Sequence, residues 1–363
     1  MKNETTVTTK QFICMMIQFQ LGIGILSLPY MTASVAGGDA WISTALTGVC
    51  VTGAILIIGM LCKRYPSYTV FEFLEFILGK VFGRIITILY VIYFFSVGVL
   101  ILISYSHVVK TWLLPNTPLW FTIALMVWIS FYLVKENLRI IGRFFVCVTV
   151  LLIILFFLVT FTLKDANFLY ILPIGHMGWS AILKGSKEAF LSFAGFEGFL
   201  IIYPYIQGTP TKKVKAALIG NTCITLFYMY IVCVTSVYFS PLELKKIPEP
   251  VLYLVKTLSL HVIARIDLIF LSIWIVSAMT SIVIYMYVVS TGIATLFFQK
   301  HHSKPLPFIA ILFFIATLIL YPNVSTLQNY VANSAIFLIL CLPVVLLFLS
   351  YARKKKEFGT KSS

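Results

Sequence analysis

Charged residues are scarce in this chain. Asp, Glu, Lys and Arg make up only 11% of its 363 residues, whereas a soluble globular protein carries about 25%. Hydrophobic residues account for 60%, and they occur in runs of the length that a membrane-crossing helix needs, about 20 residues each. The composition excludes an ordinary soluble domain and predicts an all-α polytopic membrane protein in contact with the lipid bilayer.

Signatures of soluble chemistry are also missing. The sequence has no P-loop, no dinucleotide fingerprint and no Ser-His-Asp or Cys-His constellation outside the apolar runs, so we expect no enzyme. Six of the seven cysteines lie within apolar runs, which argues against disulfides and Cys-ligated metal. The five histidines share no metal-ligand spacing, and neither a metal nor a cofactor is expected. No apolar stretch with a small-residue cleavage site follows Met1 to Gln11, so a cleaved signal peptide is not expected.

The net charge of +15 is distributed as membrane topology requires, not as nucleic-acid binding would require. Most of the 27 lysines and arginines fall in short loops on the side that carries both termini. The positive-inside rule therefore places both termini in the cytoplasm. Residues 352–363 are predicted to form a basic cytoplasmic tail that anchors this topology and attracts anionic lipid. No nucleic-acid partner is expected.

Turn residues divide the chain, a single transmembrane domain over residues 1–363, into ten predicted spans. These are 10–35, 39–62, 82–112, 118–135, 138–163, 184–207, 213–238, 264–298, 306–322 and 328–351.

Features between the spans give further local predictions. Residues 69–79 and 241–261 have helical patterning and are predicted as interfacial helices on the inner and outer sides. Asp39 is predicted to cap the second span. Arg265 and Asp267, two residues apart, would not face each other on a helix.

The first span contains residues that a membrane helix tolerates poorly. It reads Leu21-Gly22-Ile23-Gly24-Ile25-Leu26-Ser27-Leu28-Pro29-Tyr30, and inside a helix Gly costs about 1 kcal/mol and Pro about 3 kcal/mol relative to Ala. Backbone groups freed by a break in lipid must be satisfied by protein, water or a ligand. A broken span is therefore a binding-site hypothesis.

The sixth span repeats this pattern in the opposite orientation. Gly195, Gly198 and Pro204-Tyr205 correspond to Gly22, Gly24 and Pro29-Tyr30. The chain then divides into two inverted five-helix repeats, at about 10–163 and 184–351, whose matching breaks point to a site at the bilayer midplane. The alternative is that the glycines only permit close helix packing.

A broken helix exposes backbone donors at the start of one half and backbone acceptors at the end of the other. An anionic group suits the donors, and an ammonium suits the acceptors. A small zwitterion such as an amino acid offers both groups.

The first-span motif resembles the G-x-G-I motif of amino acid–polyamine–organocation transporters. Within that superfamily, the whole chain is similar to the endospore germination permeases, the B-subunits of bacterial spore nutrient-germinant receptors. The features that carry the second resemblance are Tyr65-Pro66-Ser67 with Phe71-Glu72 and Leu78-Gly79-Lys80, Ser192-Phe193 with Gly195 and Glu197, and Arg265 followed by Trp274.

The resemblance implies a LeuT-like fold of ten helices with broken helices 1 and 6. It also implies nutrient sensing in the spore inner membrane, with a membrane A-subunit and a lipoprotein C-subunit as partners. Helices 3 and 8 would complete the pocket. The predicted ligand-binding residues are Gly22, Ile23, Gly24, Ile25, Tyr93, Val97, Ala194, Gly195, Phe196, Glu197, Trp274, Ser277, Ser281 and Tyr285.

Glu197 is the one carboxylate near the middle of a span. Because a charge there costs several kcal/mol, a role is expected: it could meet a ligand ammonium, carry a proton, or pair with a polar neighbour that stabilises the broken helix. Helix 5 has no Lys or Arg between Phe144 and Leu163, where proton-coupled members of the superfamily can place a lysine. Thr280 and Ser281 could serve a cation or only packing. These features favour a nutrient sensor, with an ion-coupled amino acid or amine permease as the alternative and a passive receptor scaffold as a third reading.

Overall fold

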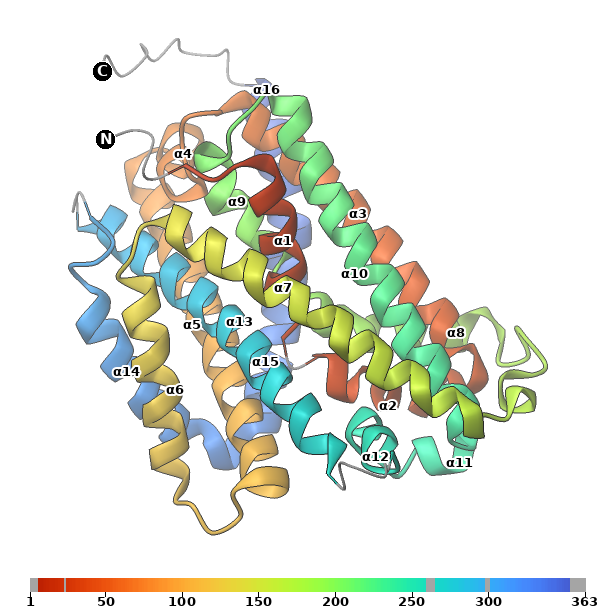
Figure 1. Cartoon of the computed structure of the whole chain (residues 1–363). Coiled ribbons are helices and arrows are strands. Elements are labelled where there is room, and N and C mark those ends of the chain that lie inside the picture. The colour runs from red at the N-terminus through yellow and green to blue at the C-terminus, as the bar shows by residue number, and fades with distance from the viewer. Residues whose placement is uncertain (1–5, 23, 259–264, 298–300, 353–363) are drawn as a thin grey trace.

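The computed structural model describes residues 6–22, 24–258, 265–297 and 301–352. Every regular element in these ranges is helical, and the helices pack side by side into one bundle (Figure 1). The α-helices are α1 (Thr9–Gln20), α2 (Gly24–Ala36), α3 (Ala40–Arg64), α4 (Val70–Leu78), α5 (Lys80–Val108), α6 (Leu119–Val134), α7 (Leu138–Phe161), α8 (Gly178–Phe190), α9 (Phe199–Ile202), α10 (Pro210–Tyr238), α11 (Pro241–Leu244), α12 (Pro250–Lys256), α13 (Ile266–Leu296), α14 (Leu306–Leu320), α15 (Val324–Ala335) and α16 (Leu342–Ala352). Short 3-10 helices are η1 (Gly37–Asp39), η3 (Thr162–Asp165), η4 (Phe168–Ile171), η5 (Leu191–Phe193), η6 (Phe196–Gly198), η7 (Tyr203–Tyr205) and η8 (Tyr321–Asn323). Short π-helical segments are η2 (Val109–Leu113) and η9 (Ile336–Cys341).

The predicted spans are found as helices. Six described helical runs are long and apolar enough to cross a membrane, and α6 is a shorter apolar helix. Two of the six runs pass through a tight turn and contain parts of two predicted spans, at Gly24–Arg64 and Leu306–Ala352. The first and sixth predicted spans are each divided, into α1 and α2 and into α8 and α9. The basic tail lies outside the described residues from position 353 onward.

Different helices form the two ends of the bundle (Figure 1). The start of α1, the end of α16 and helix α4 lie at one end, and α11 and α12 lie at the other (Figure 1). We call the first the inner end and the second the outer end, following the predicted orientation.

Local capping explains where several helices begin. Thr8 with Gln11, Thr69 with Glu72 and Ser240 with Glu243 form reciprocal capping boxes at α1, α4 and α11. The Ser240 hydrogen bonds also hold the pKa of Glu243 below its ordinary value, because they stabilise the carboxylate. These side chains satisfy backbone N–H groups that the first turn leaves free.

The loop predictions have mixed outcomes. Residues 69–79 form α4 as predicted, with Phe71 and Leu74 buried. The segment 241–261 was predicted as one helix, but its described part forms two, α11 and α12, because Pro248 and Pro250 interrupt it.

Two predictions about charged residues were wrong. Asp39 precedes α3 without capping it, and its carboxylate accepts hydrogen bonds from the N–H groups of Gly175 (2.6 Å) and Met177 (3.1 Å) in a distant loop. Arg265 does face Asp267, with its Nη2 2.8 Å from Oδ2, because Arg265 lies before the first helical turn and has non-helical backbone angles.

Small residues and one amide join α3 to α10. A Cβ atom on Gly48 would lie 2.2 Å from Thr225 Cγ2, so only glycine permits this approach. Asn221 of α10 donates to the Gly48 carbonyl at 3.1 Å and to Thr52 Oγ1 at 2.9 Å. Small residues and interhelical hydrogen bonds are the usual means of helix association in membranes.

We therefore expect Asn221→Ala to lower the free energy of unfolding by about 1 kcal/mol, the size of an interhelical hydrogen bond in a membrane protein. Thermal unfolding of the purified protein in detergent measures this. The control is Thr222→Ala, because Thr222 is exposed and its hydroxyl bonds only within its own helix. Equal melting temperatures for the two variants would contradict the assigned contact.

Candidate functional site

The break in the first span separates α1 from α2 at residues 21–23, of which Ile23 lies outside the described residues. Two carbonyls near the end of α1 accept side-chain hydrogen bonds. Ser281 Oγ donates to the Gln18 carbonyl at 3.2 Å, and Tyr228 OH donates to the Gln20 carbonyl at 2.5 Å. Protein hydroxyls thus satisfy part of the freed backbone, as a break within lipid requires.

The break in the sixth span lies at Ala194 and Gly195, between η5 and η6. Gly195 has a φ of +121°, a left-handed conformation that favours glycine. A Cβ atom there would lie 2.2 Å from the Phe19 carbonyl oxygen. The predicted break is therefore present, and it lies directly against the end of α1.

A second contact joins the two breaks on the α2 side. A Cβ atom on Gly24 would lie 2.6 Å from Ser192 Cβ, so α2 starts against η5. Tyr228 OH, which bonds to α1, also lies 3.2 Å from the Ser192 carbonyl oxygen. The glycines therefore have both of the properties considered above: they interrupt the helices, and they permit close helix packing.

Glu197 is buried and is held by protein donors. Its Oε2 accepts from the Gly195 N–H at 2.7 Å, and its Oε1 accepts from Tyr285 OH at 2.9 Å and Tyr93 OH at 3.4 Å. These partners connect the sixth-span break to α5 and α13. Of the three roles considered for this carboxylate, the geometry favours the one that stabilises the broken helix.

A neutral cluster occupies the junction of α1, α7 and α13. Thr280 Oγ1 donates to Gln18 Oε1 at 3.1 Å, and Gln18 Nε2 donates to Thr149 Oγ1 at 3.4 Å. Ser281 binds the Gln18 carbonyl as described above. The hydroxyls of Thr280 and Ser281, which were considered as cation ligands, thus both donate hydrogen bonds to Gln18.

A small cavity lies at the breaks. Its volume is about 30 Å³, enough for a water molecule, which needs about 10–15 Å³. The buried Oε1 of Gln20, which lines it, has no hydrogen-bond partner among the described residues. The lining residues are Phe19, Gln20, Gly22, Gly24, Val97, Leu100, Ile101, Leu191, Ser192, Ala194 and Tyr285.

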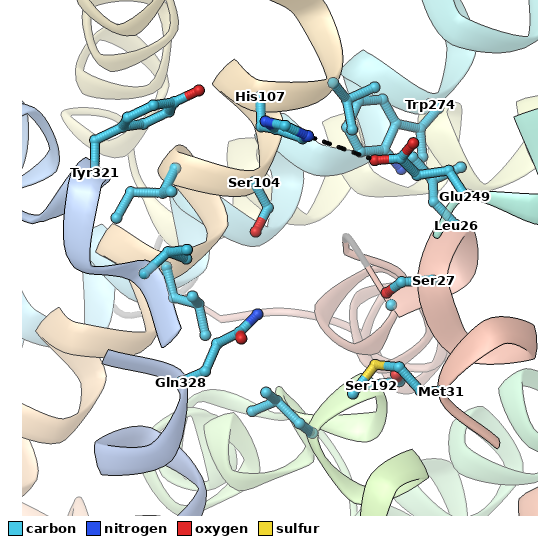
Figure 2. A pocket seen from close by; sticks show the side chains of 16 residues that line it. Leu26, Ser27, Met31, Ser104, His107, Ser192, Glu249, Trp274, Tyr321 and Gln328 are labelled. Atoms are coloured by element: carbon cyan, nitrogen blue, oxygen red, sulfur yellow. Dashed lines mark ion pairs between the residues drawn. The ribbon is translucent and has the colours of Figure 1, made fainter. Parts of the chain in front are cut away.

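A larger cavity shares part of its wall with the small one, and Figure 2 shows side chains that line it. We call it the outer cavity, because Glu249, which precedes α12 at the outer end, is among its lining residues. The two share Gly24, Leu100, Leu191 and Ser192. Its volume of about 300 Å³ is at the lower end of the range for small-molecule sites. The other lining residues are Leu26, Ser27, Met31, Ile103, Ser104, His107, Val108, Glu249, Trp274, Tyr321, Val324 and Gln328.

The inner end is closed by backbone pairing. Val7 N–H donates to the Tyr205 carbonyl at 3.0 Å, and Gln207 N–H donates to the Val7 carbonyl at 2.9 Å. Lys213 Nζ, largely buried, donates to the Tyr203 carbonyl at 3.0 Å. The segment before α1 is thereby attached to the end of the sixth span.

The predicted ligand-binding residues separate into two groups. Gly22, Gly24, Val97, Ala194, Trp274 and Tyr285 line one or both of the two cavities. Ile25, Tyr93, Gly195, Phe196, Glu197, Ser277 and Ser281 are buried around the breaks without lining these cavities. The ligand contacts of both groups stay a prediction.

Sequence reasoning missed part of the wall. Leu100 lies on the helical face that Tyr93, Val97 and Ser104 form, so helical spacing was the signal for it. Glu249 lies in a loop between two prolines, and no local pattern distinguishes it from a solvated charge.

The chain matches, over residues 6–326, a family described as "Spore germination protein". It belongs to this family. It is 29% identical to "Spore germination protein YndE" of Bacillus subtilis (strain 168) over 97% of this chain and 98% of that protein. It is also 29% identical to "Spore germination protein GerQB" of Bacillus cereus over 80% of each chain.

Among solved structures, the chain is similar to MhsT in complex with L-phenylalanine. The TM-score is 0.67 at 16% identity, over 97% of this chain and 91% of that chain. This likeness establishes the LeuT-like fold of inverted five-helix repeats with broken first and sixth helices. The family match and the six helical runs that are long and apolar enough to cross a membrane together indicate a multi-pass membrane protein.

The contact between the breaks predicts that Gly195→Ala lowers the free energy of unfolding by about 3 kcal/mol, because alanine is strained at this φ and its Cβ overlaps the Phe19 carbonyl. Gly53→Ala is the control, since a Cβ at Gly53 would meet nothing within 4 Å. The yield of folded protein and the melting temperature in detergent provide the comparison. A Gly195→Ala protein as stable as the control would show that the break does not require glycine.

Proposed function

We propose that the chain is the nutrient-sensing membrane subunit of a spore germination receptor. A small nutrient of the amino acid class would bind between helices 1, 3, 6 and 8, which correspond to α1 with α2, α5, α8 with α9, and α13. The observation that carries this proposal is a cavity that descends from the outer end onto two broken helices in mutual contact. The backbone groups around such breaks suit the ammonium and carboxylate of a zwitterion.

Binding at this place would change the arrangement of the repeats. The cavity at the breaks, about 30 Å³, is far smaller than the sites that usually hold small molecules. A ligand that descends from the outer cavity must therefore separate Gly24 from Ser192 or displace their neighbours. It would favour an arrangement with more space, by the difference of its affinity for the two arrangements.

The proposal includes the setting of the protein. We place the chain in the spore inner membrane with both termini in the cytoplasm, and we expect it to work with a membrane A-subunit and a lipoprotein C-subunit that transmit the signal. Membership of the spore germination family and the distribution of basic residues support this setting.

An ion-coupled amino acid or amine permease is the second candidate. It is favoured by the LeuT-like fold and by a cavity open at one end and closed at the other, as alternating access requires. The neutral Gln18 cluster and the absence of a Lys or Arg between Phe144 and Leu163 favour the sensor.

Filling the cavity tests the sensing role. In spores, Ser104→Trp should abolish or strongly delay nutrient-triggered germination, because the indole would occupy the outer cavity. Ser272→Trp is the matched control, since Ser272 lies on an exposed face of α13. Normal germination of Ser104→Trp spores, with the protein at the wild-type level and related receptors deleted, would overturn the proposal.

Reconstitution distinguishes the two candidates. A sensor should bind nutrient in proteoliposomes without accumulating it, so uptake of a labelled amino acid mixture should equal that of protein-free liposomes under a proton or sodium gradient. Accumulation that depends on the gradient and is lost in Ser104→Trp would establish the permease instead.

A further inference from the structure

The wall of the outer cavity includes the carboxylate of Glu249, which lacks a close Lys or Arg partner among the described residues. Glu249 precedes α12, and only 15% of its side chain is exposed. Its Oε1 lies 3.8 Å from His107 Nε2, and its Oε2 accepts from Trp112 Nε1 at 3.4 Å. No Lys or Arg of the described residues lies within ion-pair distance of it, and Lys256 contacts the Trp112 ring instead, 5.5 Å from its centroid.

These contacts leave much of the carboxylate available. An ionised carboxylate has about four lone-pair sites, and both observed contacts are long for charge-assisted hydrogen bonds. Burial without a close opposite charge is unfavourable, and a cation that entered the cavity would offset that cost.

Three further polar groups face the same space from other elements. The hydroxyls of Ser27 on α2 and Ser104 on α5, and the amide of Gln328 on α15, line the cavity. Within the described part of the chain these groups make no hydrogen bond to protein. Figure 2 shows Ser104 and Gln328 pointing into the cavity, with Glu249 beside Trp274 on its other side.

The remaining wall suits the body of an organic cation. Leu26, Ile103 and Val324 are apolar, and the rings of Trp274 and Tyr321 also line the space. Aromatic faces attract ammonium groups in addition to burying apolar surface.

From this combination we propose that the outer cavity is a binding site for a small organic ammonium, with Glu249 as its counter-charge. The site lies above the helix breaks on the path toward them. The physiological role of this site rests on the proposed function. In that role, Glu249 would give the nutrient's amino group its first contact before the ligand reaches the breaks. A ligand with a carboxylate and no amine is disfavoured at the same position.

The local potential can be measured without knowing the nutrient. In the full-length protein carrying Ser104→Cys, the cationic reagent 2-(trimethylammonium)ethyl methanethiosulfonate should react faster than the anionic 2-sulfonatoethyl reagent at low salt. Mass spectrometry of the peptide that contains position 104 separates the introduced thiol from the native cysteines. One unit charge in water changes the local concentrations of a monovalent cation and a monovalent anion in opposite directions, by about 2.4-fold each at about 8 Å and about fivefold each at about 4 Å. Glu249→Gln should therefore lower the cation-to-anion rate ratio by about fivefold or more.

Glu243→Gln is the matched control. Glu243 is exposed on α11 outside the cavity, and glutamine can keep its capping role at Ser240. An equal change of the ratio in the two variants, or no change in either, would overturn the assignment of the cavity's charge to Glu249.

Binding itself is tested with two probes of similar size and opposite charge. In the Ser104→Cys protein, n-butylammonium should slow the reaction of the introduced thiol with neutral methyl methanethiosulfonate, and n-butyrate should not. Adding Glu249→Gln should remove the protection. Protection by both probes equally, or protection that persists with Glu249→Gln, would overturn the proposal.

Germination of Glu249→Gln spores is read separately. A raised nutrient requirement would support a place for the site on the nutrient path. An unchanged response, together with lost butylammonium protection, would show that the ammonium site exists but does not lie on the nutrient path. Failure of the site and failure of its role in sensing are therefore distinguishable.

Discussion

The contact between two interrupted helices is the constraint on which the rest of the structure depends. The Phe19 carbonyl lies where a side chain on residue 195 would be, and Ser192 lies where a side chain on residue 24 would be. Two backbones can approach this closely only where glycine is present and where other groups satisfy the freed N–H and C=O groups. The Tyr228 hydroxyl satisfies one backbone carbonyl near each break, because it lies within hydrogen-bond distance of the Gln20 and Ser192 carbonyl oxygens.

The buried carboxylate of Glu197 extends this constraint to the surrounding helices. By accepting hydrogen bonds from Tyr93 and Tyr285, it ties the sixth-span break to α5 and α13. The bundle around the breaks is consequently joined by polar contacts in a region where water is scarce. A ligand that separates the breaks would act on all of these helices, which is how a local binding event could reach a partner subunit.

The inner and outer ends of the protein differ in their contacts, and the difference fits the proposed sensing function. At the inner end, the backbone of Val7 hydrogen-bonds to the Tyr205 carbonyl and the Gln207 N–H, and Lys213 binds the nearby carbonyl of Tyr203. Toward the outer end, polar side chains from several helices line a cavity whose wall includes Glu249. Under the proposed sensing function, a ligand would enter from the outer end and bias the arrangement without passage through the protein.

The sequence by itself determined the all-helical membrane class, the positions of the spans and the two breaks. These depend on local properties: apolar run length, the cost of Gly and Pro inside a helix, and capping pairs such as Thr69 with Glu72. Only the tertiary structure decided the partners of Glu197, the attachment of Asp39 to a loop more than 130 residues away, and the inclusion of Ser27, Glu249 and Gln328 in one cavity. Helical spacing specifies which residues share a face, but the rotation of that face toward its neighbours results from packing of the whole bundle.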